Sequence, residues 1–237
     1  MIRRVLLGAS LVLGAIALPA APAHALECPD TYGTQVQTYV CGLYQDVLFR
    51  TPSSREVDYW TDRVNRFPRR QTVQAFEFSV EVMVEVAGDG YHEIFGREPD
   101  PGGLGFWTDR LRSGVTTPEV YLRNLADSDE FNSLHPTSGD VVDFWYQVIF
   151  GRGPDQGGRA YWVGRLDGGM TRAVLVGTLQ NSDEAVGRGI TAVYQQILQR
   201  VPDGGAIAGW SSYFRNNGSA ALLVEIASSD EAFNSAS

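Results

Sequence analysis

The sequence has no lysine: all 19 of its basic residues are arginine. This absence excludes lysine Schiff-base chemistry and the lysine of a phosphate-binding loop. The formal net charge is −9. Because nucleic-acid binding requires clustered cations against phosphates, this charge balance argues against a nucleic-acid partner. With 43% hydrophobic and 20% charged residues, the composition also excludes collagen-like, disordered and multi-span membrane proteins.

Cysteine and histidine are scarce. The only cysteines are Cys28 and Cys41, and His92 and His135 lie far from them and from each other in the sequence. A zinc site needs three or four ligands at suitable spacing, which these four residues do not offer. An isolated cysteine pair in an oxidising compartment predicts a disulfide instead. We therefore expect a Cys28–Cys41 bridge, no metal site and no cofactor.

The longest apolar run lies at the N-terminus. Two arginines precede the stretch Val5–Leu18, and an Ala-x-Ala cleavage site ends at Ala25. The stretch is shorter than the roughly 20 residues that span a membrane, although an uncleaved anchor is the alternative. We expect residues 1–25 to be a signal peptide and the mature protein, residues 26–237, to be secreted and to lack a transmembrane segment.

One pattern recurs four times in the rest of the chain. Each copy has a Tyr, an Arg six residues later, then a Pro and a Trp, and a Ser-x-Glu element closes it. Successive copies are offset by 47, 55 and 48 residues. This regularity predicts tandem repeats of one structural unit. The copies lie at about residues 36–86, 87–138, 139–186 and 187–237.

The spacing of apolar residues within each copy is helical. Val40, Tyr44 and Val47 fall on one helical face, and each repeated Trp has an apolar partner four residues later. Thr117 and Pro118 open a third segment with an N-cap and a proline at the first helical position. We predict an all-α fold of four helical repeats of about 47–55 residues, packed into one compact or solenoid-like array.

The residue directly after each repeated Pro is also part of the pattern. In three copies it is an aspartate, and two adjacent glycines follow it closely. An aspartate there suggests a calcium loop or a phosphate cradle, but glycine offers no side-chain ligand and a helix precedes the loop. Serine replaces aspartate in the first copy, and serine caps a helix without bringing charge to a metal. We predict helix caps at these positions: Ser53, Asp100, Asp155 and Asp203.

Two further repeated charges have opposite sign. A guanidinium can bind a carboxylate through two parallel hydrogen bonds, so we predict one ion pair in each copy. The alternative is that each charge is solvated and contributes little. The pairs are Arg50 with Glu81, Arg97 with Glu130, Arg152 with Glu184, and Arg200 with Glu231.

The aromatic residues allow two interpretations. A repeated Trp on an apolar helical stripe is typical of a core, whereas sugar stacking would require exposure. We predict the core for all four, and we expect Trp145 and Tyr121, which lie off the repeated positions, to be exposed. The four are Trp60, Trp107, Trp162 and Trp210.

The loop Gly96–Gly103, the pair Phe106 and Trp107, and the segment Gly151–Asp155 resemble the signature of the domain of unknown function 4214 family. The fourth copy departs from it at Gln199 and Gly209. The resemblance implies a helical fold similar to phycobilisome linker domains and an occurrence in exported, surface-layer-associated and adhesin-like bacterial proteins. It implies no established catalytic residue.

Catalytic motifs are missing as well, since the sequence contains neither G-x-S-x-G nor H-E-x-x-H. We therefore expect a secreted, non-catalytic binding or scaffolding module of the adhesion type. Its partner would be a protein or glycan of the cell envelope or extracellular matrix. The alternatives are a hydrolase acting on cell-wall or extracellular polysaccharide and a self-assembling surface-layer component.

Overall fold

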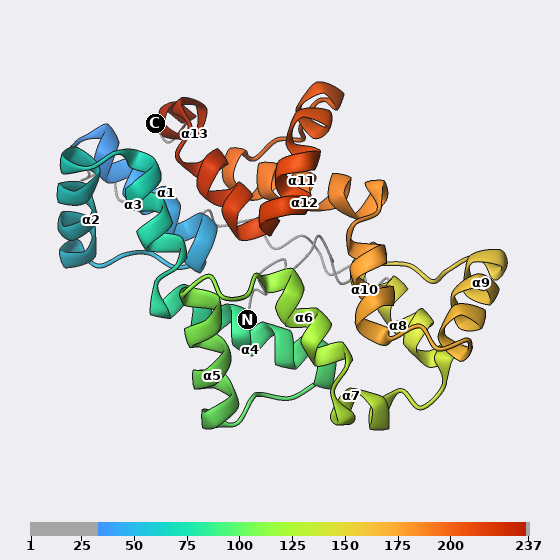
Figure 1. Ribbon diagram of the computed structural model, residues 1–237. Coiled ribbons are helices and arrows are strands. Elements are labelled where there is room, and N and C mark those ends of the chain that lie inside the picture. The colour runs from blue at the N-terminus through green and yellow to red at the C-terminus, as the bar shows by residue number, and fades with distance from the viewer. Residues whose placement is uncertain (1–32, 236–237) are drawn as a thin grey trace, which may run out of the picture.

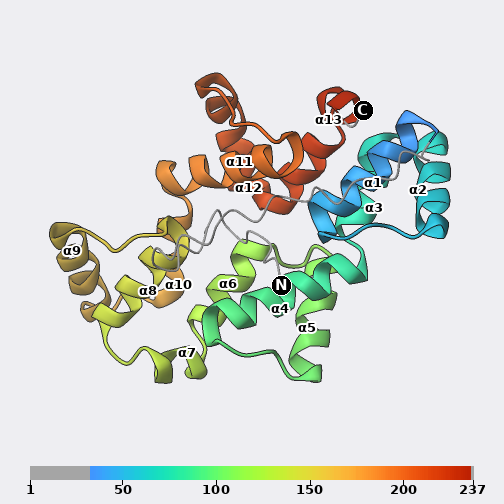
Figure 2. The same ribbon diagram turned by 180° about the vertical axis from the view of Figure 1, so that it is seen from behind.

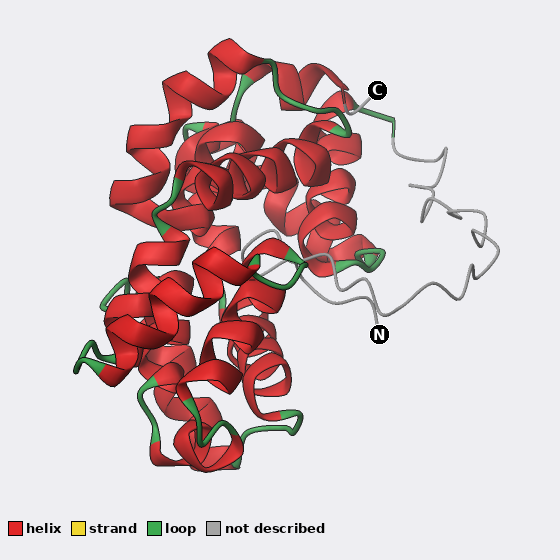
Figure 3. Cartoon of the chain, turned by 90° about the vertical axis from the view of Figure 1, so that its right-hand side faces the viewer, coloured by secondary structure: helices red, strands yellow, loops and turns green. Residues whose placement is uncertain are grey.

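The computed structural model describes residues 33–235, which form helices and connecting loops without any strand (Figures 1 and 3). The predicted all-α fold is confirmed. The helices are α1 (Gln35–Leu48), α2 (Ser54–Arg66), α3 (Arg69–Glu77), α4 (Val80–Phe95), α5 (Pro101–Arg112), α6 (Pro118–Ala126), α7 (Asp129–Leu134), α8 (Ser138–Phe150), α9 (Gln156–Asp167), α10 (Arg172–Gln180), α11 (Asp183–Leu198), α12 (Gly204–Ala227) and α13 (Asp230–Ser235).

Two predictions concern residues outside this range. The signal peptide, residues 1–25, and Cys28 lie outside the described residues, so the signal peptide and the disulfide stay predictions. Cys41 is fully buried on α1. Among residues 33–235, none of the helices combines the length and the hydrophobicity needed to cross a membrane.

Every copy has the same plan. The repeated Tyr lies on a first helix, the Trp on a second, a shorter third helix follows, and the Ser of Ser-x-Glu caps a fourth. In copies 1 and 3 the fourth helix continues as the first helix of the next copy, which produces α4 and α11. Between copies 2 and 3 the helix breaks at residues 135–137, where the longer repeat spacing falls.

The four copies lie around a common centre, and the last copy returns to the first (Figures 1 and 2). Gln35 Nε2 on α1 donates a hydrogen bond to the main-chain oxygen of Phe233 on α13, at 3.2 Å. The Tyr39 hydroxyl on α1 donates to the main-chain oxygen of Ala227 at the end of α12, at 2.7 Å. Arg70 on α3 forms an ion pair with Glu225 on α12. The array is therefore compact and closed on itself.

This closing junction between copies 4 and 1 resembles the covalent junction between copies 2 and 3. In both, the third helices of the two copies pack together, α6 with α10 and α12 with α3. In both, a short helix precedes the first helix of the following copy, α7 before α8 and α13 against α1. The two halves of the chain are thus related as approximate equivalents, copies 1 and 2 to copies 3 and 4.

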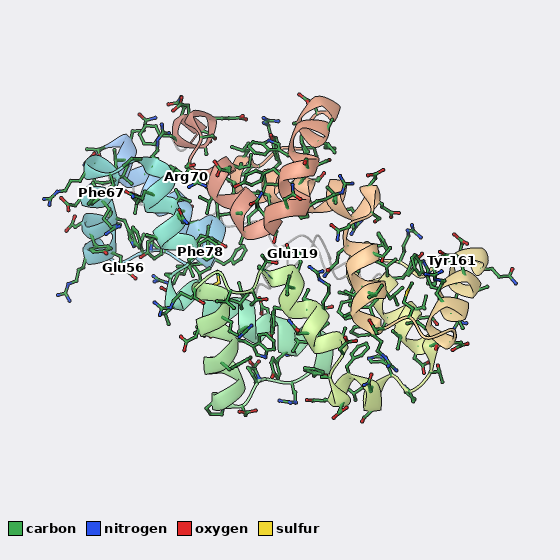
Figure 4. The ribbon with its side chains drawn as sticks, in the orientation of Figure 1. Glu56, Phe67, Arg70, Phe78, Glu119 and Tyr161 are labelled. Carbon is green, nitrogen blue, oxygen red and sulfur yellow. The ribbon has the colours of Figure 1, made fainter. Side chains whose placement is uncertain are left out.

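The third helices meet at the centre, where α3, which follows Pro68, and the second part of α12 have no side-chain N-cap of their own. Thr117 and Thr171 cap α6 and α10, but the equivalent position in copy 4 is Gly218, where α12 is kinked. The buried Glu119 of α6 supplies the missing cap, since its Oε1 accepts the Ser219 N–H at 2.9 Å (Figure 4). A carboxylate at a helix N-terminus satisfies a free N–H and is favoured by the helix dipole.

The kink predicts a sharp difference between two glycines of α12. Gly218 has φ 82° and ψ 178°, and a Cβ there would lie 2.5 Å from Glu119 Oε2. We expect Gly218→Ala to lower the free energy of unfolding by about 2 kcal/mol or more, because only glycine adopts that conformation readily. The control Gly209→Ala, in open helical surroundings, should raise it by up to about 1 kcal/mol. Urea denaturation measures the free energy of unfolding of both variants. A similar change in the two would contradict the requirement for glycine beside the Glu119 cap.

The residue before each repeated Arg gives a second prediction. It is left-handed in all four copies, but only Gly96 and Gly151 are glycine, while Phe49 has φ 52° and Gln199 has φ 53°. Because a side chain is strained in this region, we expect the exposed-site change Gln199→Gly to stabilise the protein by about 1 kcal/mol. The reverse control, Gly151→Ala, should destabilise it by a similar amount. Thermal unfolding that moves in the same direction for both variants would contradict the prediction.

Candidate functional site

The repeated charges form an ion pair in every copy, as predicted. In copy 2, Arg97 Nε and Nη2 donate to the two carboxylate oxygens of Glu130 at 2.7 and 2.6 Å. In copy 1, the Arg50 guanidinium binds both Glu81 and Glu56. The remaining pairs are Arg152 with Glu184 and Arg200 with Glu231. Each pair connects the loop before the second helix to the start of the fourth helix and so closes its copy.

The repeated Trp and Tyr residues connect the first two helices of a copy. Trp60 Nε1 donates to the Tyr44 hydroxyl at 3.0 Å, and the same bond recurs at 3.0 Å in copies 3 and 4. In copy 2, Trp107 instead packs its ring against that of Tyr121, with centroids 4.7 Å apart. All four Trp side chains are half-buried and pack against the hydrophobic core.

The expected exposure of Trp145 and Tyr121 is wrong, because both side chains are fully buried. The Tyr121 hydroxyl donates to the main-chain oxygen of Ala87 at 2.7 Å. Trp145 on α8 packs against Phe131 on α7, across the junction between copies 2 and 3. Neither residue recurs in the other copies, because each makes a contact that is particular to its place in the array.

The loop position after each Pro caps the second helix. Asp100 Oδ1 accepts the N–H groups of Gly102 and Gly103 at 2.9 and 3.0 Å, and these bonds lower the pKa of the Asp100 carboxyl. Ser53 and Glu56 form the predicted capping box. Asp155 and Asp203 cap α9 and α12. Within the described part of the chain, no three His, Cys, Asp or Glu side chains gather closely enough to hold a metal ion.

The repeated residues thus stabilise the fold. The surface of the molecule also has concave regions. One of them, here called the α10 groove, has a volume of about 1040 Å³ and lies on copy 3 beside α6. It is lined by Val120, Arg123 and Asn124 of α6, Tyr146 and Phe150 of α8, Arg152, Trp162 of α9, Ala173, Val174, Gly177, Thr178 and Leu179 of α10, and Asn181, Ser182 and Glu184.

The lining of the α10 groove combines apolar side chains around Val174, here called its floor, with polar side chains, here called its rim. Val174 is 52% exposed in it, although Leu175 and Val176 already supply the buried face of α10. The amide N–H groups of Asn124 and Asn181 donate to helix carbonyls, so their amide oxygens are available as acceptors. A concave, mostly apolar surface with a few directional polar groups is typical of a ligand site.

Arg123 contributes a cation to this groove from α6. Its guanidinium lies over Gly177 of α10, close enough that a Cβ at Gly177 would be 3.3 Å from Nη1. No ion pair of Arg123 is present among residues 33–235. Sequence reasoning missed Arg123 and Val174, although Val174 carried a signal, since it is apolar and lies off the buried face of its helix.

A separate cavity of about 270 Å³ lies at the closing junction of copies 4 and 1. Asp46 of α1 lines it together with Ile197 and Leu198 of α11, and burial raises the pKa of the Asp46 carboxyl to about 7. Its neutral form is therefore the one that the fold favours. The carboxyl ionises near pH 4 in the unfolded chain but only near pH 7 in the folded one, so the free energy of unfolding falls as the pH rises between these values.

The capping box predicts a dependence of stability on pH. The hydrogen bond from Arg50, with those from Ser53, lowers the pKa of Glu56 to about 2. A carboxyl whose pKa is lower in the folded state stabilises the protein above its unfolded pKa, and this stabilisation is lost as the pH falls towards 2. We expect Glu56→Gln to cost about 1 kcal/mol at pH 7, allowing for solvent screening, and nothing near pH 2. Urea denaturation at several pH values tests this, with Glu85→Gln on the exposed face of α4 as control; a pH-independent cost would contradict it.

One family model matches the chain three times, at residues 21–86, 87–135 and 123–189. No curated protein and no solved structure matches the chain. The fourth copy lies largely beyond the matched ranges, yet it has the same Arg200–Glu231 ion pair and the same hydrogen bond from Trp210 to Tyr194. The matches cover well over half of the chain, and it therefore belongs to the family described as Domain of unknown function (DUF4214).

Proposed function

We propose that the protein is a secreted, non-catalytic binding or scaffolding module that holds a glycan or protein of the cell envelope or extracellular matrix. The α10 groove carries this proposal. Its apolar floor around Val174 excludes water from a ligand, and the Asn124 and Asn181 amides with the Arg123 guanidinium offer directional contacts on its rim.

The frame around the groove suits binding. Arg152 and Glu184 on its edge hold each other, and Trp162 is fixed by its hydrogen bond to Tyr146. A surface built from side chains already fixed in the fold loses little conformational freedom when a ligand binds. The helices α6 and α10 pack against each other, and together they supply most of the lining of the groove.

Hydrolysis of a polysaccharide, the alternative, makes a different demand. Glycosidases of the usual kind place two carboxyl groups on either side of the scissile bond. Among the residues lining the α10 groove, Glu184 is the one acid, and it is paired with Arg152. The groove therefore supports binding better than hydrolysis.

Co-sedimentation with isolated cell envelopes tests the proposal. The protein, produced with its own N-terminal segment so that any processing takes place, should pellet with envelopes in a saturable way and stay in solution alone. Val174→Asp places a charge on the apolar floor and should weaken retention at least about tenfold, or 1.4 kcal/mol. The control Val201→Asp makes the same change at a side chain that is 64% exposed and far from the groove in sequence.

Three outcomes would overturn parts of this proposal. No pelleting at any concentration would remove the envelope as the partner. Pelleting of the protein alone, dependent on concentration, would favour a self-assembling surface layer. Equal retention of Val174→Asp and Val201→Asp would show that binding takes place outside the α10 groove.

A further inference from the structure

A second groove, here called the cationic groove, lies between copies 1 and 2. Its volume is about 540 Å³, and its lining contains two arginines and no carboxylate, in a protein whose net charge is −9. Phe67 follows α2 and Phe78 follows α3 (Figure 4). Arg63 lies in the last turn of α2, and Arg112 ends α5. Gln71 and Gln74 of α3 and Ser113 complete its polar lining.

Arg63 is held in place by aromatic rings rather than by a carboxylate. Its guanidinium carbon lies 5.9, 5.8 and 5.2 Å from the ring centroids of Tyr59, Trp60 and Phe67. Its Nε is buried and has no hydrogen-bond acceptor in the part of the chain that the structure describes. Because no carboxylate in this part of the chain neutralises it, the Arg63 guanidinium remains able to bind an anion through its other N–H groups.

The other half of the chain shows what Arg112 lacks. Its equivalent in copy 4 is Arg215, since each lies five residues after the repeated Trp. Arg215 donates to the main-chain oxygen of Asn181 at 3.2 Å and forms an ion pair with Asp183. The residue equivalent to Asp183, directly after the Ser of Ser-x-Glu, is Val80, which is 54% exposed. Among residues 33–235, Arg112 has no ion pair.

The position that holds a carboxylate beside Arg215 thus holds a valine in the half that contains Arg112. In the same half, Phe78 replaces Asn181, which adds an aromatic surface beside the cation. The bland explanation is that Arg112 only complements the dipole at the C-terminus of α5. Arg63 also lies in the last turn of its helix, α2, but the dipole explanation does not account for the meeting of both arginines in one groove or for Phe67, which is 45% exposed.

We infer that the cationic groove binds an acidic saccharide, of the class that carries uronic acids. The guanidinium groups of Arg63 and Arg112 bind carboxylates, and the Phe67 ring offers an apolar face to a sugar ring. The amides of Gln71 and Gln74 donate and accept hydrogen bonds, as sugar hydroxyls do. This site is separate from the α10 groove and does not depend on the function proposed for it.

Titration calorimetry with tetragalacturonate tests the inference, with maltotetraose as the uncharged probe. The natural chain should bind tetragalacturonate, more weakly as salt rises, and bind maltotetraose at least tenfold more weakly. Val80→Asp restores the carboxylate found at Asp183 and should lower the affinity at least fivefold without disturbing the core, since Val80 is exposed. Arg112→Met should lower it similarly, and Val201→Asp, which adds the same charge elsewhere, should leave it unchanged.

Each contrary result has a distinct meaning. Equal binding of the uncharged probe, or an unchanged affinity of Val80→Asp, would overturn the role of the cations. Equal binding of tetraglutamate would show that the groove recognises charge on a peptide as well, which would overturn the assignment to a saccharide. Envelope retention that depends on Val174 but not on Val80 would leave the α10 groove proposal standing when this one fails.

Discussion

The contact between the first and the last copy is the constraint on which the rest of the structure depends. A three- or four-helix copy of this size cannot bury its apolar face alone, and an open array would leave that face exposed at both ends. Here α12 and α13 cover α1 and α3, with the buried Tyr39 hydroxyl bonded to Ala227. Because closure fixes the order of the copies around the centre, it also brings Glu119 to the uncapped N–H of Ser219.

Within each copy, the repeated residues serve this frame. The Arg–Glu pair, the cap after the Pro and, in copies 1, 3 and 4, the hydrogen bond from Trp to Tyr connect the helices of a copy to one another. Such residues recur because every copy has the same ends to connect. The two grooves are lined both by repeated residues, such as Trp162, and by residues that differ between copies, such as Arg123 and Phe78.

The approximate equivalence of the two halves makes these differences interpretable. The same backbone position holds Asp183 in one half, where it neutralises Arg215, and Val80 in the other, where Arg112 faces a groove. One change of residue converts an internally satisfied ion pair into a cation open to a ligand. A repeat architecture can therefore acquire binding sites without disturbing the contacts that hold it together.

The sequence alone determined the helices of each copy and the local contacts that connect them. Helical spacing, the cap at Asp100 and the pairing of Arg97 with Glu130 are local, because the groups involved lie within about 30 residues and recur four times. The tertiary structure alone decided that the array closes, that Trp145 and Tyr121 are buried, and which surfaces are concave. These depend on contacts such as that of Gln35 with Phe233, 198 residues apart, which occur once and leave no repeated pattern for the sequence to display.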